Sequence, residues 1–307
     1  IIHDGGYNHH ECQKFVPIII SNILSSLLTL FDESEKMNLE INCTEQKSII
    51  RNFINEFEQK ECSILKGVPK LPNDVVAAIR QVLMSPNVIK CIKEASKIGL
   101  SDSAAYFFSN FYRISDSDYI PRPDDILRTR VKTTGIYQFS FPYKSFKFTL
   151  TDVGGQKSER KKWIYCFRNV DVVLFVASLT DYCCDSEDDS NQRNKMSDSI
   201  ELFQSLLNLR YFTNSTFVLI LNKKDLFAQQ LQFTPFSDYF PEFYGNNNYE
   251  DASKFVLEKY LACNKDENRF IYSHFSCATE TSSVDFVFKS MADSLIKKDI
   301  EQMMASK

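Results

Sequence analysis

Three short clusters of polar residues have the side chains to bind a ligand together, and each follows a stretch that is predicted to be a strand. They are residues 152–156 (DVGGQ), residues 222–225 (NKKD) and residues 276–279 (SCAT). Each cluster alone also fits a bland interpretation as a strand-terminating turn, a charged loop or a helix cap. About half of isolated Asn-Lys-x-Asp matches are expected to be no more than that. All three in this order, each after an apolar run, favour a ligand site.

The second and third clusters have the groups that recognise a guanine base. Guanine presents its N1 proton and its 2-amino group as adjacent donors, and the Asp225 carboxylate can accept from both, whereas adenine lacks this pair. Asn222 can tie neighbouring loops and reach the far edge of the base, and the stem of Lys223 can pack on its face. The Ala278 backbone N–H would then meet the O6 atom of the base.

The first cluster and the segment "LRTRVKTT" upstream have groups that suit phosphate chemistry. Asp152 can hold a water on Mg²⁺, and the Thr133 hydroxyl can ligate this ion, which prefers oxygen ligands and retains waters. Gly155 allows a backbone N–H to approach a terminal phosphate, because no side chain blocks it. Gln156 can orient a water for attack, and Arg130 can neutralise charge on the transferring phosphoryl group. For the basic residues of this segment, an exposed strand edge is the alternative.

The second half of the chain has the pattern of an α/β sheet that can position these clusters. "YQFSF" and "FKFTL" alternate apolar and polar residues, which predicts a hairpin around "PYKS". "DVVLFVASL" and "STFVLILN" are continuous apolar runs, typical of parallel strands buried on both faces, and a helical pattern separates them. Ligands of such sheets bind beyond the carboxyl ends of the strands. The clusters are therefore expected at one edge of the sheet.

The residues before Tyr119 predict helices only. The apolar run at 15–31 contains Pro17, Asn22 and three serines, so we expect a buried helix here and not a membrane span. Near the other end of the chain, apolar residues recur at helical spacing and predict a stripe that packs on the core: Val284, Val287, Phe288, Met291 and Leu295.

Composition limits the class of protein. A length of 307 residues allows two domains, and a net charge of −4 does not suit a nucleic-acid or anionic-membrane binder, so no nucleic-acid partner is expected. The 9 cysteines show no repeated C-x-x-C spacing and no signal peptide precedes them, which favours a reducing compartment over a disulfide framework.

With these motifs in place, the sequence closely resembles the α subunits of heterotrimeric G proteins. "LRTRVKTTGI" resembles their first switch, "DVGGQKSERKKWIYCF" their second, and "NKKDLF" and "SCAT" their guanine-reading loops. "IIHDGGY" and "SDSAAYFFSNFYRI" extend the similarity toward the start of the chain. The resemblance implies an α/β fold: a Ras-like GTPase domain with a parallel-rich sheet at 127–307, an inserted all-α helical domain at 7–126, and a remnant of the GTPase domain's first helix at 1–6.

The resemblance also implies roles for individual residues. Arg130 matches the family's built-in catalytic arginine, Gln156 its water-positioning glutamine and Thr133 its magnesium threonine. With Asp152 binding Mg²⁺ through water, the implied nucleotide site comprises Asp102, Ser103, Leu127, Arg128, Thr129, Arg130, Val131, Lys132, Thr133, Asp152, Val153, Gly154, Gly155, Gln156, Asn222, Lys223, Lys224, Asp225, Cys277, Ala278 and Thr279.

The implied function is a GTP-hydrolysing switch that couples receptors to effectors. GTP with Mg²⁺ would hold Thr133 and Gly155 and so order both switches, and hydrolysis to GDP would release them. The implied partners are a βγ dimer facing Lys162, Trp163 and Cys166, a G protein-coupled receptor, effectors and GTPase-activating regulators, at the cytoplasmic face of the plasma membrane. The alternative is a degenerate α subunit that acts as a nucleotide-independent interaction module.

Two departures from the family pattern bear on these expectations. The phosphate-binding loop, of the form G-x-x-x-x-G-K-[ST], is not among these residues and is expected just before Ile1, so the 307 residues alone should bind nucleotide poorly. Lys157 stands where arginine is usual, and the tail "KKDIEQMMASK" leaves the subclass open.

Overall fold

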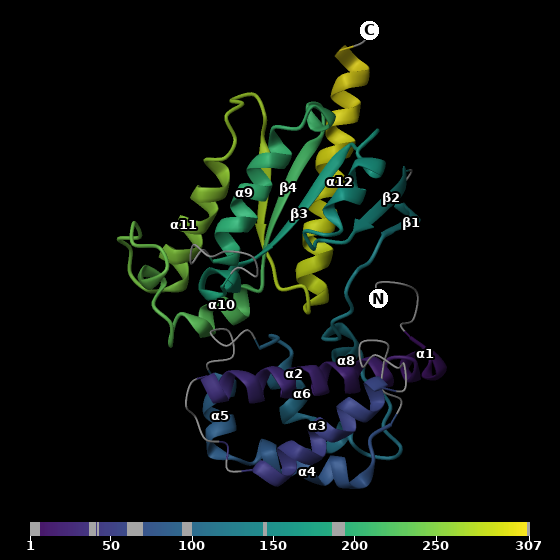
Figure 1. Ribbon diagram of the computed structural model, residues 1–307. Coiled ribbons are helices and arrows are strands. Elements are labelled where there is room, and N and C mark those ends of the chain that lie inside the picture. Colours follow the sequence, from purple (N-terminus) through teal and green to yellow (C-terminus); the bar gives the residue numbers. More distant parts are fainter. Residues whose placement is uncertain are drawn as a thin grey trace. The chain divides into compact units, whose positions relative to one another are not determined.

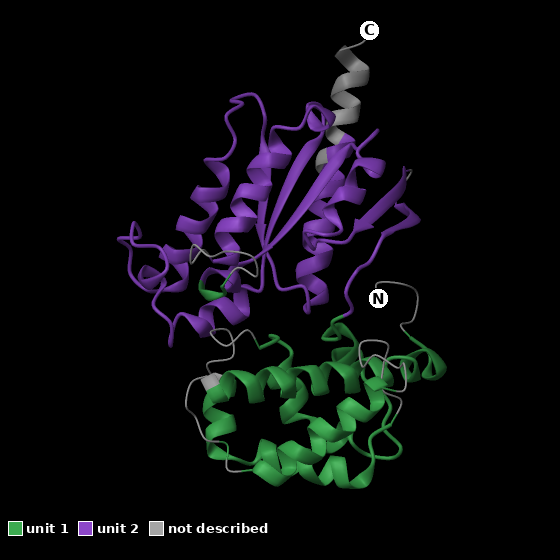
Figure 2. Ribbon diagram, in the orientation of Figure 1, with its two compact units in different colours: residues 1–130, 183–192 green, residues 131–182, 193–307 purple. Residues whose placement is uncertain are grey.

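The fold is rich in helices and contains a parallel sheet (Figure 1). The computed structural model describes residues 7–36, 41, 43–59, 70–93, 100–143, 146–185 and 194–305. The chain divides into two compact units, here called unit 1 (residues 1–130 and 183–192) and unit 2 (residues 131–182 and 193–307; Figure 2). The helix remnant predicted at residues 1–6 lies outside the described residues.

Unit 1 is built from helices, and no strand lies among its described residues up to 130, as the sequence predicts. Its helices are α1 (His9–Gln13), α2 (Val16–Lys36), α3 (Thr44–Gln59), α4 (Asn73–Leu83), α5 (Pro86–Lys93), α6 (Ala104–Ser109), α7 (Phe111–Ile114) and α8 (Pro123–Leu127).

The long apolar helix α2 forms the centre of the core of unit 1. Ile19, Ile23, Leu24, Leu27 and Phe31 are fully buried, and each contributes about 1.5–3 kcal/mol by leaving water. The stretch His9–Glu35 is long and apolar enough to span a membrane by composition, and half of its most apolar window is buried inside the protein. Core packing therefore accounts for its apolar character, as predicted for residues 15–31.

Unit 2 contains an antiparallel hairpin and a parallel sheet. Strands β1 (Ile136–Tyr143) and β2 (Phe146–Val153) form the predicted hairpin, with Ile136 opposite Val153. Strands β3 (Val172–Ser178), β4 (Thr216–Asn222) and β5 (Ile271–Phe275) are parallel, in the order β3-β4-β5. The helices are α9 (Lys195–Leu207), α10 (Lys224–Gln230), α11 (Tyr249–Leu261) and α12 (Thr281–Ala305), with short 3₁₀ helices η2 (Arg160–Cys166), η3 (Leu179–Cys183), η4 (Arg210–Phe212) and η5 (Phe236–Asp238).

Helices cover both faces of β4. Since successive strand residues point to opposite sides of a sheet, neighbouring residues of β4 contact different helices. Phe217 contacts Phe203 of α9 at a ring-centroid distance of 6.0 Å. On the other face, Val218 and Ile220 pack with Val287 of α12. Val287, a member of the apolar stripe predicted on α12, thus packs on the core as expected.

The next residue of that stripe joins α12 to the hairpin of unit 2. The Phe288 ring lies 5.6 Å from Phe141, 5.0 Å from Tyr143 and 5.6 Å from Phe148, measured between ring centroids. Aromatic pairs at such distances contribute about 0.5–1.5 kcal/mol beyond the area that they bury. One helix therefore anchors both the hairpin and the parallel sheet.

Strand β3 differs from the prediction that it is buried on both faces. Phe175 and Ala177 are buried, but Leu174 is 39% exposed and Val176 is 57% exposed. In the described part of the chain, β3 is an edge strand, paired only with β4. A continuous apolar run does not reveal whether its strand lies at the edge or the centre of a sheet, so the sequence overestimates its burial.

Candidate functional site

Asn222 ties the loop after β4 to the loop after β5. Its side-chain oxygen accepts hydrogen bonds from the Ala278 N–H at 3.0 Å and from the Ser276 hydroxyl at 3.1 Å. The Lys224 N–H donates to the Ser276 carbonyl at 3.2 Å. Because β4 and β5 are parallel, both loops leave the same edge of the sheet. The structure therefore contains the link between loops that we expected of Asn222.

The backbone at the start of α10 turns sharply. Lys223 has φ of 64° and ψ of 37°, a left-handed conformation that costs a non-glycine residue about 1–2 kcal/mol. The turn places Asp225 in the first turn of α10 with its carboxylate exposed, and Ala278 in the tied loop is exposed as well. Cys277 beside it is buried, with Sγ 3.1 Å from the Thr279 hydroxyl. The Asp225 carboxylate and the backbone of the Ala278 loop, which lie at the same end of the sheet, can form hydrogen bonds with a planar base.

The two adjacent glycines have different structural roles. A Cβ atom on Gly154 would lie 2.4 Å from the Thr133 carbonyl oxygen and 2.8 Å from the Glu159 side chain. A Cβ atom on Gly155 would meet no atom within 4 Å. The Gly154 N–H also donates to the Gly135 carbonyl at 3.3 Å. Gly154 is thus required by the close approach of residues 133–135, while the space around Gly155 is open.

The helix η2 binds the carbonyls of both glycines. The indole N–H of Trp163 donates to the Gly154 carbonyl at 2.8 Å, and Nε of Arg160 donates to the Gly155 carbonyl at 3.2 Å. Movement of the glycine pair would therefore change the surroundings of Trp163, the only tryptophan in the chain. The role of Arg160 was not predicted, since nothing distinguishes it from its basic neighbours in the sequence.

Glu159 links the segment after Thr133 to η2. Its Oε2 atom accepts from the Gly135 N–H at 2.8 Å and from the Lys162 ammonium group at 2.7 Å. The hydrogen bond from Lys162, followed by that from Gly135, holds the pKa of the Glu159 carboxyl below its usual range. Sequence reasoning missed this residue, because its partners are 24 and 3 positions away and no pattern marks them.

The residues predicted to bind magnesium offer oxygen donors. Thr133 is partly buried next to Gly154, and Asp152 is exposed at the end of β2. Among the residues that the structure describes, no group of three or more His, Cys, Asp or Glu side chains could hold a metal ion. One hydroxyl and one carboxylate fit Mg²⁺, which usually binds one or two protein oxygens together with substrate phosphates and waters.

The predicted site residues fall in both units. Unit 1 contains Asp102, Ser103 and residues 127–130, and unit 2 contains residues 131–133, 152–156, 222–225 and 277–279. The Arg130 and Gln156 side chains, which we expect to act in catalysis, are both exposed. Within unit 2, residues 133 and 154 are brought together, as are residues 222 and 278.

A buried carboxylate supports the segment that carries Arg130. Asp125 in α8 is 0% exposed and accepts a bidentate pair of hydrogen bonds from Arg113, at 2.7 and 2.9 Å. The hydroxyls of Tyr106 and Tyr119 donate to it at 2.7 and 2.9 Å, and the Arg122 N–H donates at 2.8 Å. Sequence reasoning missed this cluster, since its members are spread over three helices and a loop.

The charge of this cluster is stable at neutral pH. Burial by itself would raise the pKa of Asp125, but the hydrogen bonds from Arg113, Arg122, Tyr106 and Tyr119 outweigh burial and hold the pKa well below its usual range. Burial, followed by the bond to Asp125, raises the pKa of Tyr106 to about 12. The carboxylate is therefore ionised and both tyrosines stay protonated.

The exposed face of η2 differs from the partner-facing set that the sequence predicts. Lys162 is exposed, whereas Trp163 and Cys166 are partly buried, and burial raises the pKa of the Cys166 thiol. The large apolar side chains that η2 exposes are Ile164 at 45% and Tyr165 at 82%. Sequence reasoning did not single out these two residues, although they follow Trp163 directly.

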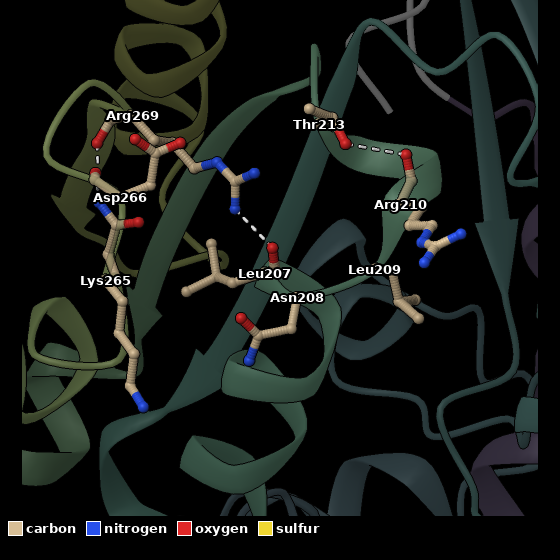
Figure 3. A pocket seen from close by; sticks show the side chains of 9 residues that line it. Leu207, Asn208, Leu209, Arg210, Thr213, Lys265, Asp266 and Arg269 are labelled. Carbon is tan, nitrogen blue, oxygen red and sulfur yellow. Dashed lines mark hydrogen bonds between the residues drawn. The ribbon is translucent and has the colours of Figure 1, made fainter.

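A shallow pocket of about 310 Å³ lies in unit 2 away from these groups (Figure 3). The Arg269 guanidinium points into it and donates to the Leu207 carbonyl. Its lining comes from segments that precede β4 and β5, whereas Asn222 and Ser276 follow these strands. The pocket therefore lies at the opposite edge of the sheet from the candidate site, and its lining residues are Leu207, Asn208, Leu209, Arg210, Thr213, Asn264, Lys265, Asp266 and Arg269.

Comparison with known proteins relates nearly the whole chain to one family. The model of the G-protein alpha subunit family matches residues 1–295. A curated relative, the guanine nucleotide-binding protein alpha-4 subunit of Caenorhabditis elegans, is 36% identical over 303 residues. The match covers 98% of this chain and 84% of the relative.

Proposed function

The chain belongs to the G-protein α-subunit family and is a heterotrimeric G-protein signalling switch, and on this premise we propose how its own residues bind and hydrolyse GTP. Members of this family bind GTP and GDP and are GTPases in general. The roles below are assigned to residues by their position, chemistry and contacts.

The loops tied by Asn222 read the guanine base. The single observation that carries this assignment is the pair of hydrogen bonds from Ala278 and Ser276 to the Asn222 side-chain oxygen. This link sets the Ala278 loop beside the start of α10, where the exposed Asp225 carboxylate can accept from N1 and the 2-amino group. Lys223 packs on the base, and Lys224, Cys277 and Thr279 complete the loops around it.

The phosphate chemistry belongs to Arg130 and Gln156. Gln156 orients the attacking water, and the Arg130 guanidinium neutralises charge on the transferring phosphoryl group. Thr133 and Asp152 would hold Mg²⁺, which when bound supplies positive charge to the phosphate oxygens. The remaining contacts to the nucleotide are assigned to Asp102, Ser103, Leu127, Arg128, Thr129, Val131, Lys132, Val153, Gly154 and Gly155.

The switch acts through the glycine pair. When a terminal phosphate is present, the Gly155 N–H binds it and the backbone of the glycine pair moves. This movement shifts the Gly154 and Gly155 carbonyls, to which Trp163 and Arg160 donate hydrogen bonds. Loss of the phosphate reverses this and rearranges η2. The exposed surface of η2 thereby reports which nucleotide is bound.

Domain roles and partners follow from the family. Residues 7–126 act as a helical domain inserted into a Ras-like GTPase domain at 127–307, a division supported by the change from unit 1 to unit 2 after residue 130 of the chain. The switch surface with Lys162, Trp163 and Cys166, together with the exposed Ile164 and Tyr165, binds the βγ dimer, and receptors, effectors and GTPase-activating regulators are further partners. The protein works as a peripheral protein at the cytoplasmic face of the plasma membrane.

Asp225→Asn in the full-length protein tests the base assignment. The asparagine replaces one acceptor oxygen with a donor, so we expect affinity for GDP to fall by about 100-fold or more while affinity for xanthosine diphosphate rises, because each bond to a charged group is worth about 1.5–3 kcal/mol. Competition against a fluorescent nucleotide measures both. Asp238→Asn, an exposed carboxylate in the same unit, is the control. Unchanged base preference would contradict the assignment, and a wild-type protein that binds no nucleotide would favour the interaction-module alternative.

The glycine pair gives a second prediction. Gly155→Ala should fold with nearly wild-type stability, since its Cβ meets no atom within 4 Å, but should fail to change its Trp163 fluorescence between GDP and a non-hydrolysable GTP analogue. Gly154→Ala should instead destabilise the free protein by about 1–3 kcal/mol, because its Cβ overlaps the Thr133 carbonyl. Urea unfolding and tryptophan emission distinguish the two variants. Equal stability losses would contradict the assigned difference between them.

A further inference from the structure

One polar side chain in the core helix of unit 1 binds the backbone of Arg130. Asn22 lies in α2, next to the fully buried Ile23. Its Nδ2 donates to the Arg130 carbonyl at 3.0 Å, and its Oδ1 accepts from the Arg130 N–H at 2.6 Å. Both residues belong to unit 1, although they are 108 positions apart in the chain. The amide thus binds both polar groups of one residue's backbone.

This contact differs from those of two hydroxyl side chains in α2. The Thr29 hydroxyl donates to the Ser25 carbonyl and the Ser34 hydroxyl to the Phe31 carbonyl, so both satisfy themselves within the helix. Such local bonds are the usual outcome for hydroxyl side chains in a helix interior. Asn22 reaches out of its helix instead, to a segment without regular secondary structure.

Asn22 binds the chain just beyond the last hydrogen bonds that follow helix α8. Helix α8 ends at Leu127, and the last local bonds are those of Thr129, whose N–H and hydroxyl both reach the Ile126 carbonyl. Arg130 is the next residue, and Asn22 binds its backbone there. The arginine side chain takes no part in the contact and is exposed. The contact therefore locates the backbone from which the guanidinium extends and leaves the guanidinium available.

We propose that Asn22 is a positioning residue for the catalytic Arg130, an inference that rests on the proposed function. An arginine that stabilises a transferring phosphoryl group acts only if its charge is held in place, and a misplacement of about 1 Å can cost roughly 100-fold in rate. The core helix of unit 1 supplies this placement through one amide. The contact requires both a donor and an acceptor, a combination that Asp, Leu and Ala lack.

Hydrogen exchange of the Arg130 amide tests the contact without nucleotide. In the full-length protein we expect this amide to exchange at least about tenfold faster in Asn22→Ala than in the wild type, since the amide loses its acceptor. Asn22→Asp keeps an acceptor for the N–H and should retain most of the protection. Thr29→Val removes a bond internal to α2 and is the matched control, with no change expected at Arg130. Equal exchange in wild type and Asn22→Ala would overturn the proposal.

Single-turnover GTP hydrolysis tests the consequence. We expect Asn22→Ala to slow hydrolysis by about 10- to 100-fold with a change in GDP affinity below about threefold. Asn22→Asp lacks the donor to the Arg130 carbonyl and should fall between. In an Arg130→Ala background, Asn22→Ala should cause no further loss, because nothing remains to be positioned. A further loss of the same size would overturn the proposal and indicate a general structural role.

The two experiments separate this inference from the function on which it rests. A wild-type protein that neither binds nor hydrolyses GTP would overturn the proposed function, and with it the role of the contact. The exchange rate of the Arg130 amide can be measured in the absence of nucleotide, so it still decides whether Asn22 holds this backbone.

Discussion

Arg130→Ala in the full-length protein is expected to slow GTP hydrolysis by about 10³-fold or more. Arginines in this role are generally worth about 10³ to 10⁵ in rate, in this family as in others, which corresponds to about 4–7 kcal/mol of transition-state stabilisation. The exposed guanidinium makes no contact that folding requires, so stability should change by less than about 0.5 kcal/mol. Single-turnover phosphate release and urea unfolding measure the two effects.

A second variant and a control sharpen this result. Gln156→Leu should also lose hydrolysis while it retains GTP binding, because the side chain that orients the water is gone. Arg168→Ala, an exposed arginine of unit 2 outside the candidate site, should hydrolyse GTP at the wild-type rate. Normal turnover in Arg130→Ala or in Gln156→Leu would show that the catalytic groups lie elsewhere.

Asp125→Ala is expected to destabilise the protein by about 3–5 kcal/mol. The variant leaves the Arg113 guanidinium, 26% exposed, without its carboxylate partner, and removing one member of a buried pair typically costs this much. The hydroxyls of Tyr106 and Tyr119 lose an acceptor as well. Urea unfolding followed by circular dichroism measures the change.

The neighbouring carboxylate provides a matched control. Asp124 lies 3.6 Å from Arg128 and its side chain is 70% exposed, so Asp124→Ala should change stability by no more than about 1 kcal/mol. Similar losses in the two variants would contradict the view that the buried Asp125 cluster, and not the general charge of α8, holds this helix.

The same cluster predicts a pH dependence. The pKa of Asp125 is lower in the folded protein than in the unfolded chain, so its contribution is complete above the unfolded value of about 3.9 and is lost as the pH falls from there toward the folded value. The stability of the wild type should therefore decrease on acidification below about pH 4 more steeply than that of Asp125→Asn. Parallel curves for the two proteins would contradict this assignment.

Much of the candidate site could be predicted because it follows from strand pattern and residue chemistry. Continuous apolar runs marked β3 and β4, a strand was also expected before residues 276–279, and parallel strands bring their carboxyl ends to one edge. The link through Asn222 was expected on that basis, and the structure contains it. The same pattern failed for Leu174 and Val176, whose exposure depends on which strands pair with β3.

The missed residues share a physical reason. Asn22 acts on Arg130 from 108 positions away, and Glu159 acts on Gly135 from 24. Neither spacing is a period of a helix or a strand, so no local signal identifies the partner. In the sequence, Asn22 stood out only as an amide side chain within an apolar helix. A hydrogen bond inside the core of unit 1 would have explained an amide at this position equally well.

The sequence by itself determined the chemistry available to this protein: the acceptor Asp225, the amide Gln156 and the two glycines, each after a recognisable strand, and the cation Arg130 upstream of them. Residue type and local periodicity suffice for that, because they are properties of short stretches of chain. Only the tertiary structure decided that Gly154 is the glycine that close packing requires, and that Asn22 holds the backbone of Arg130. These depend on distances between segments far apart in the chain, which form only when the cores pack.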